Sequence, residues 1–320
     1  MKVDKQSFDE VVCFNDENHK YFTKDTKESF ISVTTLIHKF SQEFDEQFWS
    51  RYKALQKLAG EDEFDGPVIG KNKRGPASPA KEALLDTKKY DHKWTYYFGV
   101  SEEELEEEAA NIRAYYVEER EKSCFRGTKI HKNMEDSITS KSSMNIDFLT
   151  GEHASAISGL FKFSENTREL VPGNVYPEIL LYRISPDGEL KVAGQVDLLI
   201  IDHDGGVYIL DWKTNKELKK KSYYNQKVRK SVRMKYPLNN LDDCNFNHYQ
   251  LQLSLYYWIV NKQNPNLFLK GLYIVHFDHN GNEATHQCEY LKDEVERMLT
   301  FYKKDLKHNS FKQQMEKINY

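Results

Sequence analysis

Cysteine is scarce in this chain of 320 residues, and its few copies are not clustered. The four cysteines form no C-x-x-C pair and lie far apart, at positions 13, 124, 244 and 288. Zinc knuckles and disulfide frameworks both require closely or regularly spaced cysteines, so neither is expected here. Reduced thiols in a cytoplasmic protein are the simplest interpretation.

Long apolar runs are missing as well. No stretch approaches the roughly 18–20 apolar residues of a membrane span, and the first residues lack the apolar core that is typical of a secretory signal. The G-x-x-x-x-G-K-[ST] sequence that cradles nucleotide phosphates is also absent. We therefore expect no membrane partner, no ATP and no motor activity within this chain.

The most informative pattern that is present is a hairpin with charged residues on apolar strands. The turn His203-Asp204-Gly205-Gly206 separates two mostly apolar segments, and glycine supplies the positive φ that tight turns need. Asp211 and Lys213 are two residues apart and project from the same side of their strand, and a hairpin brings Asp197 beside them. Buried acids are costly unless they bind something. A divalent Mg²⁺ or Mn²⁺ ion, which takes carboxylate and carbonyl oxygens, is the natural ligand.

Charge is unevenly distributed around the overall net charge of −4. Residues 102–108 are almost all glutamate, which predicts a solvated helix face, whereas residues 213–235 contain ten lysines and arginines and one acid, Glu217. Local positive potential attracts a polyanion, and interleaved tyrosines can stack on unpaired bases. A charge run more often forms only a solvated surface, but this one directly follows Lys213. We predict that it binds single-stranded DNA through Lys216, Lys219, Lys220, Lys221, Tyr223, Tyr224, Arg229 and Arg233.

The remaining periodicities indicate a mixed α/β chain without internal repeats. Residues 8–40 suggest a short β-rich entry, residues 61–80 a loop, and residues 216–240 a basic excursion from the core. Helices are expected at 44–60, 101–140, 246–262 and 290–307, and strands at 174–184, 190–202, 206–213 and 268–277. We expect a mainly helical N-terminal lobe at 1–119 that helps to admit DNA, a core at 120–310 and a C-terminal tail at 311–320.

These segments carry a set of motifs in a fixed order. An Arg126–His131 helix segment contains G-x-x-x-H, Pro177-Glu178 begins a strand, and Asp197 precedes Asp211-Trp212-Lys213. Gln252 and Tyr256 then form Q-x-x-x-Y on the helix that follows. The set resembles the PD-(D/E)XK nuclease superfamily, and within it the RecB-like branch. Ser32–Leu36 also resembles the opening segment of the mitochondrial genome maintenance exonuclease and related phage exonucleases.

The resemblance implies a restriction-endonuclease-like core, in which helices flank a mixed central sheet. It implies one or two Mg²⁺ or Mn²⁺ ions bound by His131, Asp197, Asp211 and the Trp212 carbonyl. Lys213 would help to activate water, and Glu178 would position metal or water. Gln252 would donate to a phosphate or hold the attacking water, and Tyr256 would bond to a phosphate or to Lys213. Tyr249, one turn before Gln252, would contact DNA. The late cysteines do not reproduce the cluster ligands of some RecB-like nucleases, so no Fe–S cluster is expected.

The function that this resemblance implies is a metal-dependent DNA exonuclease acting on single-stranded or frayed ends in replication, recombination or repair. A bacterial cell or a phage-infected host is the expected setting, and any helicase, recombinase or single-strand-binding protein would be a separate chain. Three alternatives stay open: a structure-specific endonuclease on the same fold, a catalytically inactive nucleic-acid-binding module, and an enzyme that cleaves RNA. Each chemical role also has a plainer alternative, in which the same residue is a structural ion pair, a core residue or a surface residue.

Overall fold

The structure is a computed structural model that describes residues 5–7, 9–59, 99–140, 162–163, 170–225 and 230–318. The predicted loop at 61–80 and Arg229 lie outside these ranges. The chain divides into two compact units. The larger comprises residues 1–42 and 126–320, and the smaller comprises residues 43–125.

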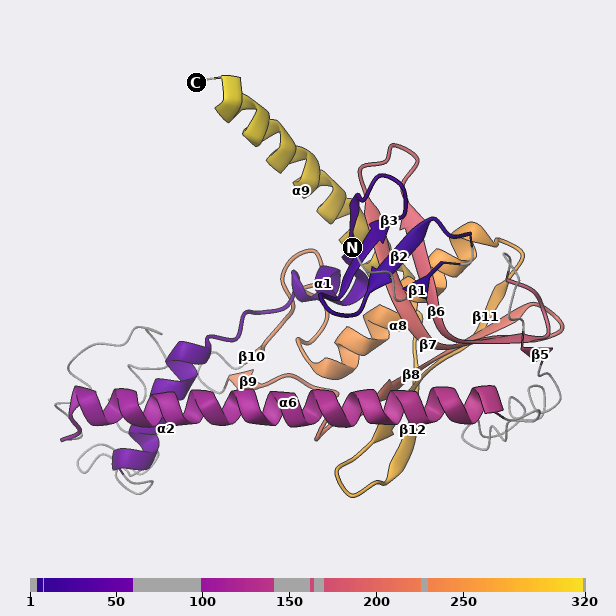
Figure 1. The fold of residues 1–320 in the computed structure, drawn as a ribbon. Coiled ribbons are helices and arrows are strands. Elements are labelled where there is room, and N and C mark those ends of the chain that lie inside the picture. Colours follow the sequence, from indigo (N-terminus) through magenta and orange to yellow (C-terminus); the bar gives the residue numbers. More distant parts are fainter. Residues whose placement is uncertain are drawn as a thin grey trace. The chain divides into compact units, whose positions relative to one another are not determined.

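The larger unit is built on a mixed sheet, which is ten-stranded in the described part of the chain (Figure 1). Its central strands follow the order β6-β7-β8-β11-β12, and β4 joins β7 in parallel beyond the end of β8. A separate two-stranded hairpin, β9–β10, follows β8. The strands are β1 (Lys5–Gln6), β2 (Val12–Asn15), β3 (Lys20–Thr23), β4 (Ser29–Ser32), β5 (Lys162–Phe163), β6 (Asn174–Ile184), β7 (Lys191–Ile201), β8 (Gly206–Lys213), β9 (Tyr224–Asn225), β10 (Lys230–Ser231), β11 (Phe268–Phe277) and β12 (Glu283–Cys288).

The predicted hairpin is confirmed as β7 and β8. Its turn uses Gly205 at a φ of 86°, and the buried carboxylate of Asp202 accepts the Gly206 N–H at 2.7 Å and the Asp204 N–H at 3.0 Å. These bonds satisfy backbone donors that the tight turn would otherwise leave unpaired. The predicted strands near β6 and β11 are confirmed too. β12 was not anticipated, because its residues alternate weakly and only one of them is buried.

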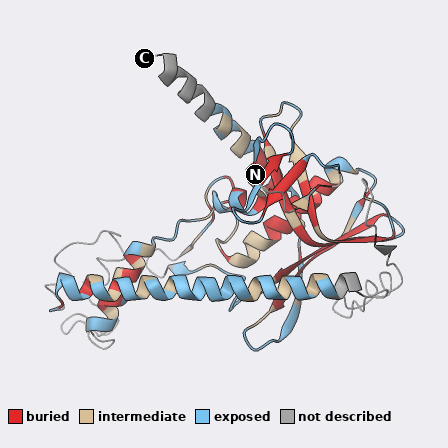
Figure 2. Ribbon diagram, viewed as in Figure 1, coloured by how far each residue is buried: buried red, intermediate tan, exposed pale blue. Residues whose placement is uncertain are grey.

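Helices cover one face of the sheet and bury its main core. This face carries α1 (Val33–His38), α8 (Asn245–Gln263) and α9 (Lys292–Ile318). The Ser32 side chain caps α1 by accepting the Thr35 N–H at 2.9 Å, which satisfies a donor at the helix start. Buried residues in Figure 2 concentrate in the sheet and α8. α9 continues to Ile318, through the segment predicted as a tail.

The opposite face of the sheet carries a second, smaller core around Trp212 and Tyr208. Met134 packs against it from α6 (Glu102–Ser140), which begins in the smaller unit and ends in the larger one. The two faces together confirm the predicted class, a mixed sheet flanked by helices.

Strands β1 to β4 belong to the larger unit and not to the N-terminal lobe. β4 pairs with β7 through Ile31 and Ser32, and Phe14 and Phe30 share a buried cluster with Leu180. The boundaries between the two compact units therefore lie after Gln42 and after Phe125, whereas we predicted a single boundary after residue 119. Sequence spacing could not reveal this, because the pairing joins residues that are more than 150 positions apart.

The smaller unit is helical, with α2 (Glu46–Ala59) packed on the first part of α6 around Leu55 and Leu105. The acidic segment 102–108 is more than the solvated face that we expected. Arg51 pairs with Glu102 and Glu106 from this segment, and Lys57 with Glu108 at 2.6 Å. Within the described ranges, none of the helices combines the length and apolar character that a membrane crossing requires.

Candidate active site

The site lies where β7 and β8 diverge. β7 pairs with β8 only from Leu198 to Ile201, while β8 continues beside β11 as far as Lys213. The side chain of Asp197 bridges the fork, because its Oδ2 accepts the Trp212 N–H at 2.7 Å. A carboxylate thus takes the place of a missing backbone acceptor, which keeps two diverging strands joined and brings an acid to the opening.

Glu178 faces the same fork from β6. The register pairs Pro177 with Leu198 and Ile179 with Val196, so Glu178 stands opposite Asp197. Its φ is 51°, a left-handed conformation that costs an L-residue other than glycine about 1–2 kcal/mol. Strained backbone of this kind persists only where surrounding structure enforces it, and it is common at functional sites.

Both strands reverse their buried faces at this point. Val175 and Leu198 pack in the core around Trp212, whereas Ile179 and Val196 pack in the core beneath α8. Simple alternation would keep residues an even number of positions apart on one face. The reversal at Glu178 and Asp197 turns both carboxylates toward the fork.

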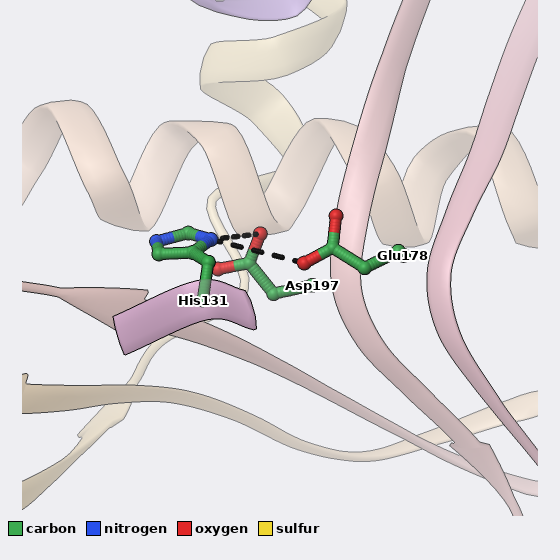
Figure 3. A group of neighbouring side chains, drawn as sticks. All are labelled: His131, Glu178 and Asp197. Carbon is green, nitrogen blue, oxygen red and sulfur yellow. Dashed lines mark ion pairs between the residues drawn. The ribbon is translucent and has the colours of Figure 1, made fainter. Parts of the chain in front are cut away.

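His131 completes a group of three potential metal ligands (Figure 3). Its Nδ1 lies 3.5 Å from Asp197 Oδ1 and 3.8 Å from Glu178 Oε1, and one ligand atom from each of the three residues lies within 4.8 Å of the others. The other ring nitrogen, Nε2, lies 3.1 Å from the Trp212 carbonyl oxygen. α6 is anchored here because Arg126 donates to the Phe277 carbonyl at 2.8 Å.

The charges in this group shift its protonation equilibria. Burial lowers the pKa of His131, but the charges of Glu178, Asp197 and Asp211 raise it by more, so that the pKa is about 9. Burial and the charge of Asp211 raise the pKa of Asp197 to about 7. Burial raises the pKa of Glu178, but His131, Lys5 and Gln195 lower it more. Without a cation, the group therefore holds a proton on His131 at neutral pH.

Asp211 and Lys213 form the other half of the site. Asp211 is 1% exposed. Its Oδ2 lies 2.5 Å from Lys213 Nζ, and its Oδ1 accepts from Gln252 Nε2 at 3.1 Å. Burial lowers the pKa of Lys213, but Asp211 and Asp197 raise it more, so the lysine is an ammonium ion.

α8 contributes the polar side chains that contact this pair. Gln252 Nε2 also lies 3.2 Å from the Tyr256 hydroxyl, and Lys213 Nζ lies 3.5 Å from Gln252 Oε1. Tyr256 is buried against Gly194, where an added Cβ would stand 2.6 Å from the tyrosine ring. Burial raises the pKa of Tyr256 well above its usual range, so its hydroxyl stays protonated.

The structure brings the predicted site residues together, with one regrouping. His131 and Asp197 adjoin Glu178, which we expected to position metal or water, while Asp211 is bound to Lys213 and Gln252. The Trp212 carbonyl faces His131. The roles assigned to these residues remain predictions.

Several contacts at the site were not anticipated. Lys5 Nζ lies 3.4 Å from Glu178 Oε2, and Gln195 donates to the same carboxylate. Gln195 is two positions before Asp197 on β7, but the strand reverses its buried face at Asp197, so period-two alternation does not identify this contact. No sequence signal marks Lys5, because strand pairing alone brings β1 to this position.

The basic excursion leaves the sheet after Lys213 and contains the β9–β10 hairpin. Tyr223 is 70% exposed and Tyr224 is 52% exposed. The second half of the basic excursion returns to the protein interior, since Met234 and Leu238 pack in the main core. Arg233 pairs with Asp242 at 2.9 Å. The predicted DNA-binding lysines Lys216, Lys219, Lys220 and Lys221 are exposed.

Comparison with known proteins identifies the family. The model of the PD-(D/E)XK nuclease superfamily matches residues 78–318. The chain belongs to this superfamily. The match agrees with the mixed sheet and with the acids and lysine at the fork, and it supports a nuclease. No curated protein matches the sequence.

Two solved structures show weak similarity. A protein designated SSO0001 shares 18% identity over 41% of this chain and 50% of its own chain, with a TM-score of 0.27. A candidate exonuclease from Eubacterium rectale shares 10% identity over 87% of this chain and 79% of its own chain, with a TM-score of 0.32. Similarity at this level carries no information about the substrate.

Proposed function

We propose that this nuclease is a metal-dependent DNA exonuclease that hydrolyses phosphodiester bonds from single-stranded or frayed ends. The observation that carries the proposal is the convergence of His131, Glu178 and Asp197 beside the Asp211–Lys213 pair. Three acids, an imidazole and an ammonium group at one strand fork suit phosphodiester hydrolysis better than they suit a structural role, because burying them is costly.

The donor set fits a divalent cation. Two carboxylates and one imidazole offer oxygen and nitrogen atoms within 4.8 Å of one another, and Asp211 lies beside them. We propose that His131, Glu178 and Asp197 hold Mg²⁺ or Mn²⁺, with Asp211 and the Trp212 carbonyl as further ligands. The imidazole favours Mn²⁺. When bound, the cation would supply Lewis-acid activation of the phosphate and of water.

The remaining residues would orient the phosphate and the attacking water. Lys213 is held as an ammonium ion, so its proposed role is to donate to the phosphate or the water and not to act as the general base. Gln252 connects Lys213, Asp211 and Tyr256 through its amide. Such a fixed arrangement keeps donors directed at the position where negative charge develops.

The proposed preference for unpaired DNA is supported by the basic excursion, and the preference for strand ends by the resemblance to RecB-like exonucleases. Exposed lysines track phosphates, and the exposed rings of Tyr223 and Tyr224 can stack on unpaired bases. Lys216, Lys219, Lys220, Lys221 and Arg233 would supply the phosphate contacts. We propose a RecB-like, mitochondrial-exonuclease-like enzyme of replication, recombination or repair that works in the cytoplasm, with any helicase, recombinase or single-strand-binding protein as a separate chain.

A time course on labelled DNA tests this function. Linear single-stranded, linear double-stranded and circular single-stranded DNA are incubated with Mg²⁺, Mn²⁺ or EDTA, and matched RNA serves as a further substrate. We expect linear single strands to be shortened from an end only when metal is present, while circles stay intact. Linearised circles would instead indicate an endonuclease, and preferred cleavage of RNA would indicate a ribonuclease.

Two variants exclude a binding module without catalysis. Asp211→Asn and Lys213→Ala should each lose cleavage by a factor of about a thousand or more while keeping DNA affinity within about threefold. Wild-type cleavage rates in either variant would contradict the roles proposed for these residues. DNA binding by the wild-type protein without cleavage in any metal would support the module instead.

A further inference from the structure

Tyr249, which we predicted to contact DNA, lies against Lys213. It precedes Gln252 by one turn on α8, and the Lys213 ammonium stands over its ring, 4.5 Å from the ring centre. A cation over a tyrosine face is attracted by the negative face of the ring. The ring therefore contributes both attraction and steric confinement at the end of a flexible side chain.

Three different groups surround the Lys213 ammonium. Asp211 Oδ2 lies at 2.5 Å, Gln252 Oε1 at 3.5 Å, and the Tyr249 ring covers a further side. A lysine side chain has four carbons and many rotamers, so two polar contacts alone leave it free to swing. Asp211 is also a proposed metal ligand, and a cation would draw its charge away from the lysine. Gln252 and the ring would then be the contacts that still hold Lys213.

Tyr249 is itself fixed at both ends. Its backbone belongs to α8, and its hydroxyl donates to Asn215 Oδ1 at 2.6 Å. Asn215 is held in turn, because its carbonyl oxygen lies 2.7 Å from His276 Nε2 on β11. The first residues of the basic excursion are thereby attached to the ring that contacts the lysine.

We infer that Tyr249 is a positioning residue, which holds the Lys213 ammonium toward the reacting phosphate through its ring face and does not bind DNA. The inference rests on the proposed function. It differs from a DNA-binding role in what it predicts: loss of the ring changes the rate of the chemical step and leaves DNA affinity unchanged.

Kinetics of two variants separate these roles. Tyr249→Leu removes the ring, and Tyr249→Phe keeps the ring but loses the bond to Asn215. Tyr302→Leu is the matched control. Tyr302 lies on α9, and the Lys39 ammonium stands over its ring, 5.7 Å from the ring centre, in the same kind of contact but without Lys213. We expect Tyr249→Leu to lower the single-turnover cleavage rate about tenfold or more. Tyr249→Phe should stay within about threefold of wild type, and Tyr302→Leu should leave the rate unchanged.

DNA affinity, measured in EDTA, completes the comparison. We expect Tyr249→Leu to bind single-stranded DNA within about twofold of wild type. A variant that binds DNA at least tenfold more weakly but cleaves at the wild-type rate once saturated would overturn the inference and restore the DNA-binding role. Equal losses in Tyr249→Leu and Tyr249→Phe would also overturn it, because the ring would then be irrelevant.

A spectroscopic measurement makes the inference independent of catalysis. Protons on the Lys213 side-chain carbon next to Nζ should resonate upfield in wild-type protein, because Nζ stands over the Tyr249 ring. Lys213→Arg assigns the signal. The signal should move to the ordinary lysine position in Tyr249→Leu. An unshifted wild-type signal would refute the positioning role even in an active nuclease. A shifted signal in a protein that cleaves no nucleic acid would keep the contact and refute the proposed function.

Discussion

Asparagine in place of Asp197 is expected to stabilise the metal-free protein while abolishing cleavage. Asp197 is 7% exposed, and burial with the charge of Asp211 raises its pKa from 3.8 to about 7. Each unit corresponds to about 1.4 kcal/mol. Keeping this acid ionised in the folded chain therefore costs up to about 4 kcal/mol above its folded pKa.

The net gain from Asp197→Asn is smaller than this limit. An amide oxygen can still accept the Trp212 N–H, but the ionic contact with His131 is lost. We expect an increase of about 1–3 kcal/mol in the free energy of unfolding at about pH 8 in EDTA. The gain should shrink as the pH falls through 7 toward 3.8, because the wild-type carboxyl is then protonated in the folded state.

Urea denaturation at several pH values measures this effect, and Asp202→Asn is the matched control. Asp202 is also a buried acid, in the turn after β7, but it is paired with Lys270 and accepts the Gly206 N–H. Its replacement should destabilise the protein by about 1–3 kcal/mol. The reasoning is refuted if Asp197→Asn is also destabilising at about pH 8, or if its effect does not depend on pH.

Three further predictions concern neighbouring residues. Glu178→Gly should be more stable than Glu178→Ala by about 0.5–1 kcal/mol in urea denaturation, because only alanine retains the cost of the positive φ; equal stability would contradict a strained backbone. Manganese binding at about pH 7.5 should release close to one proton, since His131 has a pKa of about 9 without metal, and affinity should rise with pH up to that value. Calorimetry in buffers of different ionisation enthalpy measures the proton, and binding without release would contradict the assigned ligand. Gly194→Ala should destabilise by about 1–3 kcal/mol, because the added Cβ meets the rigid Tyr256 ring at 2.6 Å; an unchanged thermal midpoint would show that the ring can move.

Much of the fold could be predicted from the sequence, for identifiable reasons. β7 and β8 carry apolar residues on both faces and meet at a glycine turn, so local pattern and tertiary structure agree. α8 was predictable from its amphipathic pattern, in which Leu251, Leu255 and Ile259 form the core-packing stripe. β12 was missed because exposed edge residues carry little periodicity. That β1 to β4 belong to the larger unit was missed because it depends on pairing between distant parts of the sequence.

The candidate site was predictable at the level of residues but not of contacts. Motif order placed Asp197, Asp211 and Lys213 together, and they do converge. The grouping of Glu178 with His131 depends on a left-handed backbone and a reversal of faces, which no sequence period encodes. Tyr249 was assigned to DNA binding, and no sequence signal predicted its contact with Lys213, because that contact depends on how α8 packs beside β8.

The central claim is that His131, Glu178 and Asp197 bind a divalent cation. An anomalous difference map from crystals grown with Mn²⁺ tests it most directly. The account predicts a peak bonded to His131 Nδ1 and to one oxygen each of Glu178 and Asp197, at about 2.0–2.3 Å. A map with no peak at this fork, or with manganese bound only elsewhere, would contradict it.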